Sequence, residues 1–119
     1  MQKQRVFISY DYSNDRNYKD MLLAWDTQNE FDFDCNDSSA IKRVISARID
    51  ESTVFLCLVG KSTHQSSWVE WEINKAVELK KIIAAVRIDS DNPTPSCLYG
   101  VGAKWAQSFT FENLKRVLE

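Results

Sequence analysis

One glutamate in this sequence, Glu72, lies at a position where a charged side chain needs either an interaction partner or a chemical function. On a helical wheel drawn at about 100° per residue, Glu72 falls inside an apolar arc. The arc is formed by Trp68, Val69, Ile73, Ala76, Val77 and Leu79. A charge on a core-facing stripe costs several kcal/mol unless it is paired, hydrated or used. Three interpretations stay open: a salt bridge to Lys75, a carboxylate that reaches solvent at the edge of the arc, and a catalytic carboxylate.

The residues around Glu72 separate it from the other acids of the same segment. Ser67 and Glu70 have the spacing of a capping box, which gives Glu70 a structural role. Glu78 falls opposite the apolar arc and is expected in solvent. Trp68 precedes Glu72 by four residues, so the two side chains share a face. An aromatic ring beside a half-buried carboxylate suits a partly cationic ring in a ligand, although core packing also explains the tryptophan.

The cysteines and the histidine offer weaker chemistry. Cys35, Cys57 and Cys97 are odd in number and widely spaced, and the sequence has no CxxC motif. Neither disulfides nor a metal site is therefore expected. A catalytic cysteine needs a histidine partner, and the only histidine, His64, is expected in a loop.

Composition excludes several classes of function. The chain of 119 residues carries a net charge of -2, which predicts one domain over residues 1–119 and argues against nucleic acid as a partner. No stretch approaches the ~20 apolar residues of a membrane span, and the N-terminus MQKQRVFISY lacks the apolar core of a signal peptide. We therefore expect a cytoplasmic protein that binds neither nucleic acid nor a membrane.

The elements that position these residues alternate regularly between strands and helices. Strands are predicted at Arg5–Tyr10, Phe31–Cys35, Thr53–Val59 and Ile82–Ile88, with a weak one at Ala103–Phe109. Helices are predicted at Asp15–Thr27, Ser38–Asp50, Ser67–Lys81 and Phe111–Leu118, and a long loop at Ser90–Gly102. This alternation is typical of an α/β fold, a parallel sheet with helices on both faces.

The patterns of the strands predict their order in the sheet. The most apolar strands belong inside, and the alternating FDFDC strand belongs at an edge. A flavodoxin-like three-layer sandwich with five parallel strands in the order 2-1-3-4-5 meets both requirements. In such sheets ligands bind at the carboxyl ends of the strands where the order reverses, here between the first and third strands. Two segments end there, Ser9–Asp11 and Gly60–Ser62, and the helix that carries Glu72 follows the second.

Three segments resemble Toll/interleukin-receptor (TIR) domains. RVFISYDYSND is similar to their first strand, STVFLCLVGKST to their third, and SSWVEWEI to the S-x-W-x-x-x-E segment of the following helix. The similarity extends from Arg5 to about Ile88, and DSSAIKRVI before the third strand also fits. The chain most resembles the compact bacterial TIR-like group related to the NAD-consuming subunit of Thoeris antiphage defence.

This resemblance implies cleavage of the nicotinamide–ribose bond by hydrolysis or cyclisation, with NAD⁺ as the substrate and no other cofactor. Glu72 matches the essential glutamate of the family, and Trp68 matches the aromatic residue that holds the nicotinamide end. Ser9, Tyr10 and Asp11 match the strand end that lines the substrate cleft. The resemblance also implies a homo-oligomer, and an ADP-ribose-derived signal in antiviral defence that acts on a separate effector protein.

This chemistry needs only one acid. Nicotinamide leaves NAD⁺ as a neutral molecule because the pyridinium already carries the positive charge, whereas ordinary glycosidases use a second carboxyl group partly to protonate the leaving group. Glu72 can therefore hold the ribose hydroxyls and stabilise an oxocarbenium-like transition state. Water, the adenine ring or another nucleophile then traps the ADP-ribosyl cation.

Two features depart from the family pattern. Asp11 stands where many members have arginine or lysine, so neutralisation of the pyrophosphate passes to Lys61, with Ser62 beside it, to backbone amides, or to a second chain. The stretch between the second strand and its helix is short, and within it Asp37 and Ser38 are candidate N-caps of that helix.

Trp71 is a candidate interface residue. Trp71 falls near the solvent side of its helix, where it either forms an interface or packs under a neighbouring loop.

Two other functions stay open. A non-catalytic TIR-like interaction module would keep the fold without needing Glu72, and a nucleoside deoxyribosyltransferase-like enzyme would use a glutamate on nucleosides. A receiver domain needs an aspartate where Gly60 stands, and a dehydrogenase needs G-x-G-x-x-G, which is absent.

Overall fold

A computed structural model describes residues 3–36 and 41–119, in which strands and helices alternate. The strands are β1 (Gln4–Ser9), β2 (Phe31–Cys35), β3 (Val54–Val59), β4 (Ile82–Arg87) and β5 (Lys104–Trp105). The α-helices are α1 (Tyr12–Trp25), α2 (Lys42–Glu51), α3 (Ser67–Glu78) and α4 (Phe111–Leu118). Two short 3₁₀ helices, η1 (Thr63–Gln65) and η2 (Ser96–Leu98), lie in the connections.

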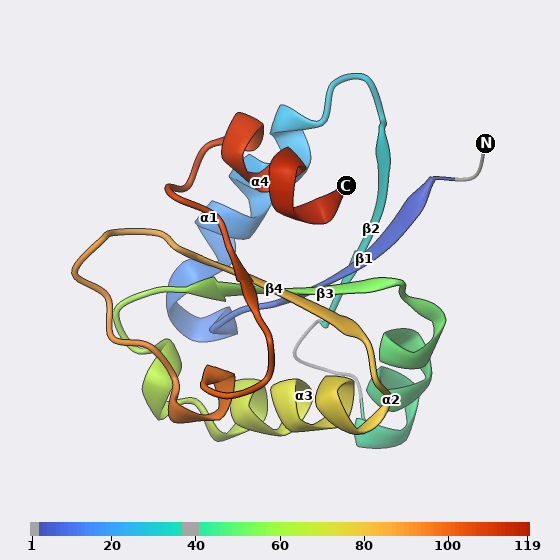
Figure 1. Cartoon of the computed structure of the whole chain (residues 1–119), viewed down its shortest axis with the longest axis vertical. Coiled ribbons are helices and arrows are strands. Elements are labelled where there is room, and N and C mark those ends of the chain that lie inside the picture. The colour runs from blue at the N-terminus through green and yellow to red at the C-terminus, as the bar shows by residue number, and fades with distance from the viewer. Residues whose placement is uncertain (1–2, 37–40) are drawn as a thin grey trace.

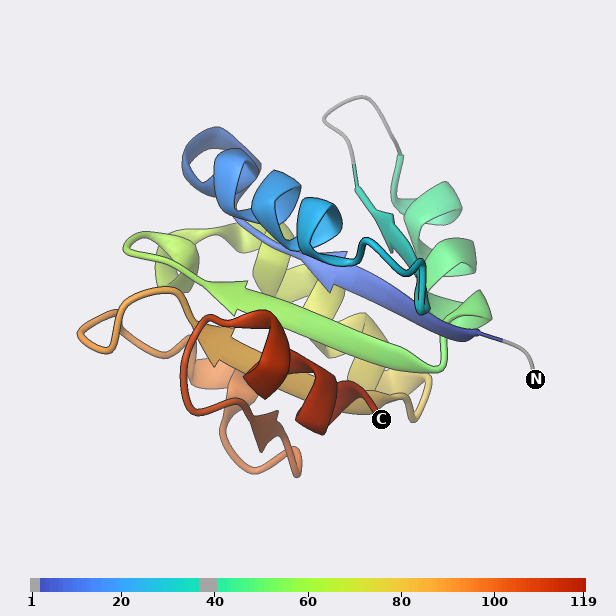
Figure 2. The same cartoon turned by 90° about the horizontal axis from the view of Figure 1, so that it is seen from above.

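The strands form one parallel sheet in the order β2-β1-β3-β4-β5, which confirms the predicted topology. Helices α1 and α4 cover one face of the sheet, and α2 and α3 cover the other (Figures 1 and 2). Each face has its own hydrophobic cluster, one built around Leu22 and Leu114 and the other around Ile45 and Ile73. The fold is therefore the three-layer α/β sandwich that the alternation of elements predicts.

Burial explains why the strands have the sequences they have. All six residues of β3 are buried, because this central strand is covered by helices on both faces. Strand β2 lies at an edge, where Phe31 and Phe33 turn inward while Asp32 and Asp34 are exposed. The charged side chains on β2 also oppose pairing with a further strand.

Several boundaries differ from those predicted. Helix α1 begins at Tyr12 and not at Asp15, because the Asp11 side chain caps it. Helix α3 ends at Glu78 and not at Lys81, since Lys80 has a left-handed φ of 60° that cannot continue a helix.

Strand β5 and helix α2 are also shorter than expected. Only Lys104 and Trp105 pair with β4, because the chain then turns away towards the N-cap of α4 at Thr110. Helix α2 begins at Lys42 after an N-cap at Ile41. The predicted N-cap residues, Asp37 and Ser38, lie outside the described residues. Among the described helices, none has both the length and the apolar character needed to cross a membrane.

Candidate active site

Glu72 is held inside the protein between α3 and the end of β1. Its side chain is only 1% exposed. The Ser9 hydroxyl donates a hydrogen bond of 2.7 Å to Glu72 Oε1. The second carboxylate oxygen, Oε2, is buried and has no hydrogen-bond partner among the described residues. One oxygen of the carboxylate is thus fixed and the other is free to interact with something else.

The two simpler interpretations of Glu72 are wrong. Lys75 pairs with Glu78 at 3.0 Å, so it does not form the expected salt bridge. Burial also prevents Glu72 from reaching solvent at the edge of the apolar arc. That arc is narrower than predicted, because Val77 is exposed. The carboxylate is therefore a buried, unpaired acid in the second turn of α3.

Burial raises the pKa of Glu72 from its ordinary value of 4.5 to about 7, against the opposing effects of Ser9 and Trp68. The Trp68 indole N–H lies close enough to lower the pKa, yet it is itself buried without a partner in hydrogen-bonding geometry. Desolvation dominates because a charged carboxylate loses its water on burial. Near neutral pH the group is therefore a mixture of carboxylate and acid.

The predicted capping box is wrong by one residue. Helix α3 is capped by Ser66, whose hydroxyl accepts a hydrogen bond of 3.2 Å from the Val69 backbone N–H. Position N3 is consequently Val69 and not Glu70, so Glu70 has no reciprocal capping role. Glu70 is exposed in the first turn, where its charge suits the helix dipole.

A pocket of about 280 Å³ lies between the carboxyl ends of β1 and β2 and the start of α3. Its wall consists of Tyr10, Asp11, Tyr12, Ser13, Asn36, Ser66 and Trp68. Glu72 does not line the pocket, but Trp68 lies one helical turn before it and Tyr10 directly follows Ser9. The structure thus places Ser9 and Trp68 next to Glu72, and it places Tyr10, Asp11 and Trp68 around the pocket.

Asp11 has a structural use that the sequence did not reveal. Its carboxylate accepts a hydrogen bond of 3.2 Å from the Ser13 backbone N–H and one of 2.7 Å from the Asn14 side chain. It is therefore the N-cap of α1. Asn36, which lines the same pocket, was also missed, because nothing local in the sequence indicates that the end of an edge strand faces α3.

Lys61 and Ser62 are not brought together with Glu72. They line a separate cavity of about 350 Å³ with residues of α1 and of the segment after β4. The buried Asp15 lies in this cavity against Gly60, where a side chain would overlap its carboxylate. Burial and the nearby charge of Asp11 raise the pKa of Asp15. A hydrogen bond from Thr63 lowers it, but by less. This second buried acid escaped the sequence analysis because it sits among polar residues.

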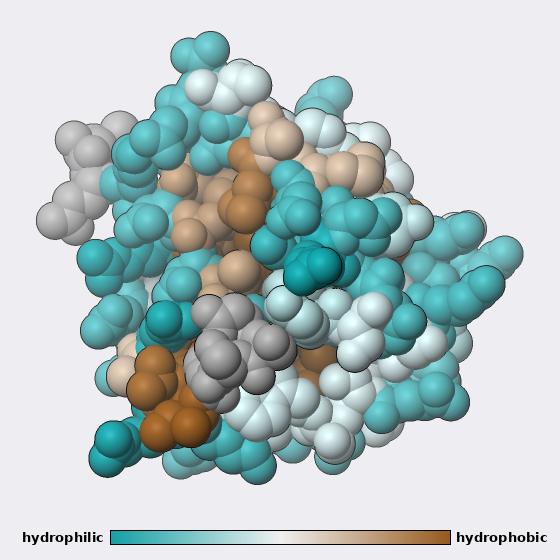
Figure 3. Space-filling view, turned by 180° about the vertical axis from the view of Figure 1, so that it is seen from behind, coloured by the Kyte–Doolittle hydropathy of each residue, from teal (hydrophilic) through white to brown (hydrophobic). Residues whose placement is uncertain are grey.

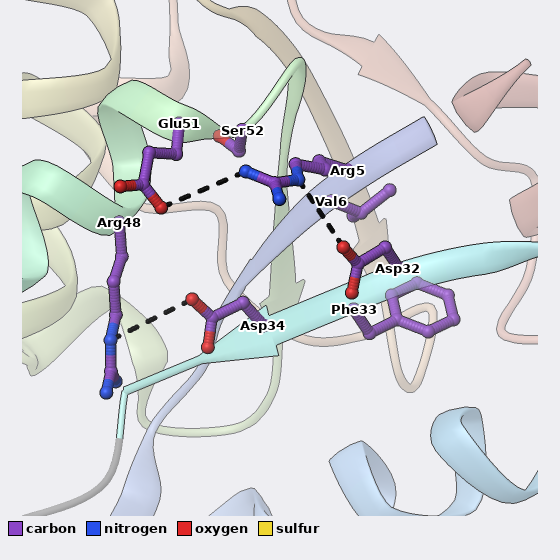
Figure 4. Close-up of a pocket in the computed structure, with 8 residues that line it drawn as sticks. All are labelled: Arg5, Val6, Asp32, Phe33, Asp34, Arg48, Glu51 and Ser52. Atoms are coloured by element: carbon purple, nitrogen blue, oxygen red, sulfur yellow. Dashed lines mark ion pairs between the residues drawn. The ribbon is translucent and has the colours of Figure 1, made fainter. Parts of the chain in front are cut away.

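A third pocket lies between the edge strand β2, the start of β1 and the end of α2 (Figure 4). Its charges pair with one another: Arg5 with Asp32 at 3.4 Å and with Glu51 at 3.9 Å, and Arg48 with Asp34 at 3.9 Å. These ion pairs tie the edge strand to β1 and α2. Because both arginines are already paired with the three carboxylates around them, we do not assign this pocket to function.

Trp71 is not the exposed residue that the helical wheel predicts. It is half-buried, with its ring 5.6 Å from that of Trp68. Lys42 lies 5.2 Å from its ring centroid and Lys75 lies 5.9 Å away. Exposed hydrophobic surface is scattered in separate patches, as the view from behind shows (Figure 3). Trp71 therefore gives no support to an interface, and a homo-oligomer stays a prediction.

The sequence matches a known protein family over most of its length. A family model described as the TIR-like domain of the Thoeris protein ThsB matches residues 7–93. The chain belongs to this family. The matched residues include the end of β1, the cap of α3 and Glu72. No functionally curated protein matches the sequence.

Solved structures match the TIR-like chain in fold. The TIR domains of the activated Roq1 resistosome, which recognises the pathogen effector XopQ, match with a TM-score of 0.62 and 19% identity over 75% of this chain. The chain spans 60% of that protein's length. The Clostridium botulinum CMP N-glycosidase BcmB matches with a TM-score of 0.60 and 14% identity over 96% of both chains. At these identities the similarity concerns the fold alone.

Proposed function

We propose that this TIR-like protein cleaves the nicotinamide–ribose bond of NAD⁺, as a glycohydrolase or a cyclase. The observation that carries the proposal is the state of Glu72, a buried carboxylate with one oxygen held by Ser9 and the other unpartnered. It lies one helical turn after Trp68, which lines a pocket with two tyrosines. Membership of the ThsB family supports the same class of activity.

The cleavage step fits a single carboxylate. The bond between ribose C1′ and the pyridinium nitrogen breaks, and its electron pair stays on the nitrogen, which leaves neutral nicotinamide. Glu72 Oε2 stabilises the positive charge that develops on the ribose. A water oxygen then bonds to C1′ and releases a proton, which Glu72 can accept because its pKa is about 7. In the cyclase reaction an adenine nitrogen replaces the water.

Substrate binding has to uncover Glu72. In the structure Glu72 is 1% exposed and does not line the pocket, whereas Trp68, one helical turn before it, does. Because Trp68 lines the pocket and lies near Glu72, we propose that rotation of its indole connects the pocket with the carboxylate. The same movement would let the ring stack on the pyridinium.

A pyrimidine nucleotide N-glycosidase is the second candidate. The similar chain BcmB is a CMP N-glycosidase that covers this chain almost completely. A pyrimidine base leaves more easily when it is protonated, and a carboxyl group with a pKa of about 7 can donate that proton. A nucleoside deoxyribosyltransferase-like reaction would make similar demands, whereas a non-catalytic interaction module would have no use for Glu72.

The decisive experiment compares NAD⁺ and CMP at high protein concentration and follows the released base by chromatography. Release of nicotinamide that is lost in Glu72→Gln and retained in Glu70→Gln supports the proposal, because Glu70 is an exposed acid on the same helix. Release of cytosine with NAD⁺ untouched selects the second candidate. Absence of turnover in a folded protein favours an interaction module.

The pH profile separates the two chemistries further. NAD⁺ cleavage needs the carboxylate, so its rate should rise between pH 6 and 8 as Glu72 ionises. A reaction that needs the acid form of Glu72 should slow over the same range.

We further propose that the product is an ADP-ribose-derived signal in cytoplasmic antiviral defence. A separate effector protein would bind this signal, and the enzyme would work as a homo-oligomer.

A further inference from the structure

The pocket beside Glu72 lacks an obvious site for phosphate groups. Among the described residues that line it, Asp11 alone is charged, and its negative side chain caps α1. Lys61, the cation expected from the sequence, lies in a different cavity. A dinucleotide carries two negative charges on its pyrophosphate, which would be repelled by Asp11 unless cations stand nearby.

Two exposed cations stand against rings that line this pocket. The Arg16 guanidinium lies 5.2 Å from the centroid of the Tyr12 ring and donates a hydrogen bond of 2.9 Å to the Tyr12 hydroxyl. The Lys42 ammonium lies 5.8 Å from the centroid of the Trp68 ring. Since Tyr12 follows β1 and Trp68 belongs to α3, the two cations approach the pocket from different walls.

Other cations near the site are less suitable. Lys19 lies 5.7 Å from the Tyr10 ring, but it forms an ion pair of 2.7 Å with Asp20 and its side chain is only 13% exposed. Lys75 is paired with Glu78 and touches Trp71, which does not line the pocket. Among the described residues around this pocket, only Arg16 and Lys42 are both exposed and in contact with a ring that lines it.

We infer that Arg16 and Lys42 recognise the phosphate groups of the substrate at the mouth of the pocket. The inference rests on the proposed function, because it concerns a phosphate-bearing nucleotide whose ribose lies near Glu72. Contact with an aromatic face restricts each long side chain before the ligand arrives, which lowers the entropy cost of binding. The planar guanidinium of Arg16 can in addition bind two phosphate oxygens at once.

The test compares NAD⁺ with nicotinamide riboside, which has the same scissile bond and no phosphate. Arg16→Gln and Lys42→Gln should each raise the KM for NAD⁺ about three- to tenfold, since the net gain from one hydrogen bond formed in competition with water is of that strength. The KM for nicotinamide riboside should stay unchanged. Arg16→Lys and Lys42→Arg keep the charge and should restore most of the affinity for NAD⁺.

Lys61→Gln and Lys75→Gln are the matched controls and should leave both substrates unaffected. A loss of NAD⁺ affinity in Lys61→Gln that is absent in Arg16→Gln and Lys42→Gln would overturn the inference. Equal losses for both substrates would overturn it too, because the cations would then only hold the rings in place.

A calorimetric titration with ADP-ribose keeps the inference testable without turnover. This ligand carries the pyrophosphate and no scissile nicotinamide bond. Weaker binding to the doubly substituted protein than to the wild type supports the inference even if NAD⁺ is not cleaved, which would count against the proposed function alone. Equal binding to both proteins, or no binding to either, refutes the phosphate role.

Discussion

Glu72→Gln should stabilise the protein while it abolishes activity. The substitution keeps the shape of the side chain and removes its charge, and the Ser9 hydroxyl keeps an oxygen or nitrogen partner at Oε1. In the unfolded chain Glu72 loses its proton near its ordinary pKa of 4.5, whereas in the folded protein it does so near 7. Between these values the folded state binds more protons, so the free energy of unfolding falls as the pH rises.

The size of the effect follows from the pKa values. Because each tenfold change in proton affinity is worth about 1.4 kcal/mol, the rise from 4.5 to about 7 destabilises the folded protein by about 3 kcal/mol above pH 7. The penalty shrinks below pH 7 and is about 1 kcal/mol or less at pH 5. Glu72→Gln should therefore exceed the wild type by about 3 kcal/mol at pH 8 and by little at pH 5.

Urea denaturation at the two pH values measures this difference. Glu70→Gln is the control, because Glu70 is exposed and its removal should change the free energy of unfolding equally little at pH 5 and pH 8. The reasoning is refuted if Glu72→Gln is no more stable than the wild type at pH 8, or if its advantage is the same at both values. Either result would mean that desolvation of the carboxylate does not dominate.

Three further substitutions or reactions test other parts of the structure. Ser9→Ala removes the donor that lowers the pKa of Glu72. The pH profile of base release should therefore move to higher pH, and kcat should fall about tenfold. Gly60→Ala places a methyl group onto the Asp15 carboxylate and should lower the free energy of unfolding by about 1–3 kcal/mol in urea denaturation; an unchanged value would show that α1 can move away. Burial raises the pKa of the Cys57 thiol, so in native protein it should react with Ellman's reagent far more slowly than the other two cysteines, and all three should react equally in urea.

The order of the strands could be predicted because it depends on local hydrophobicity. An uninterrupted apolar run such as VFLCLV indicates a strand with both faces covered, and the alternation of FDFDC indicates an edge. Both patterns are properties of neighbouring residues, and the rules for connecting parallel strands leave few possible orders. The position of Glu72 on an apolar helix face is equally local, since it follows from the helical period.

Features that depend on single hydrogen bonds between neighbouring residues were less predictable. Ser66 and Ser67 are both plausible caps, and a shift of one residue decided whether Glu70 had a structural role. Asp11 could serve the substrate or α1, and the start of α1 at Tyr12 assigned it to the helix. Small differences in free energy decide such choices, and tertiary packing easily outweighs them.

The sequence by itself determined the layers of the fold and singled out Glu72 as an acid in an apolar setting. Only the tertiary structure showed that Ser9 holds this acid, that Trp68 near it lines a pocket, and that Lys61 belongs to another cavity. The physical reason is separation along the chain. Ser9 and Glu72 are 63 residues apart, and their contact exists because β1 and α3 pack together, a relation that no local periodicity contains.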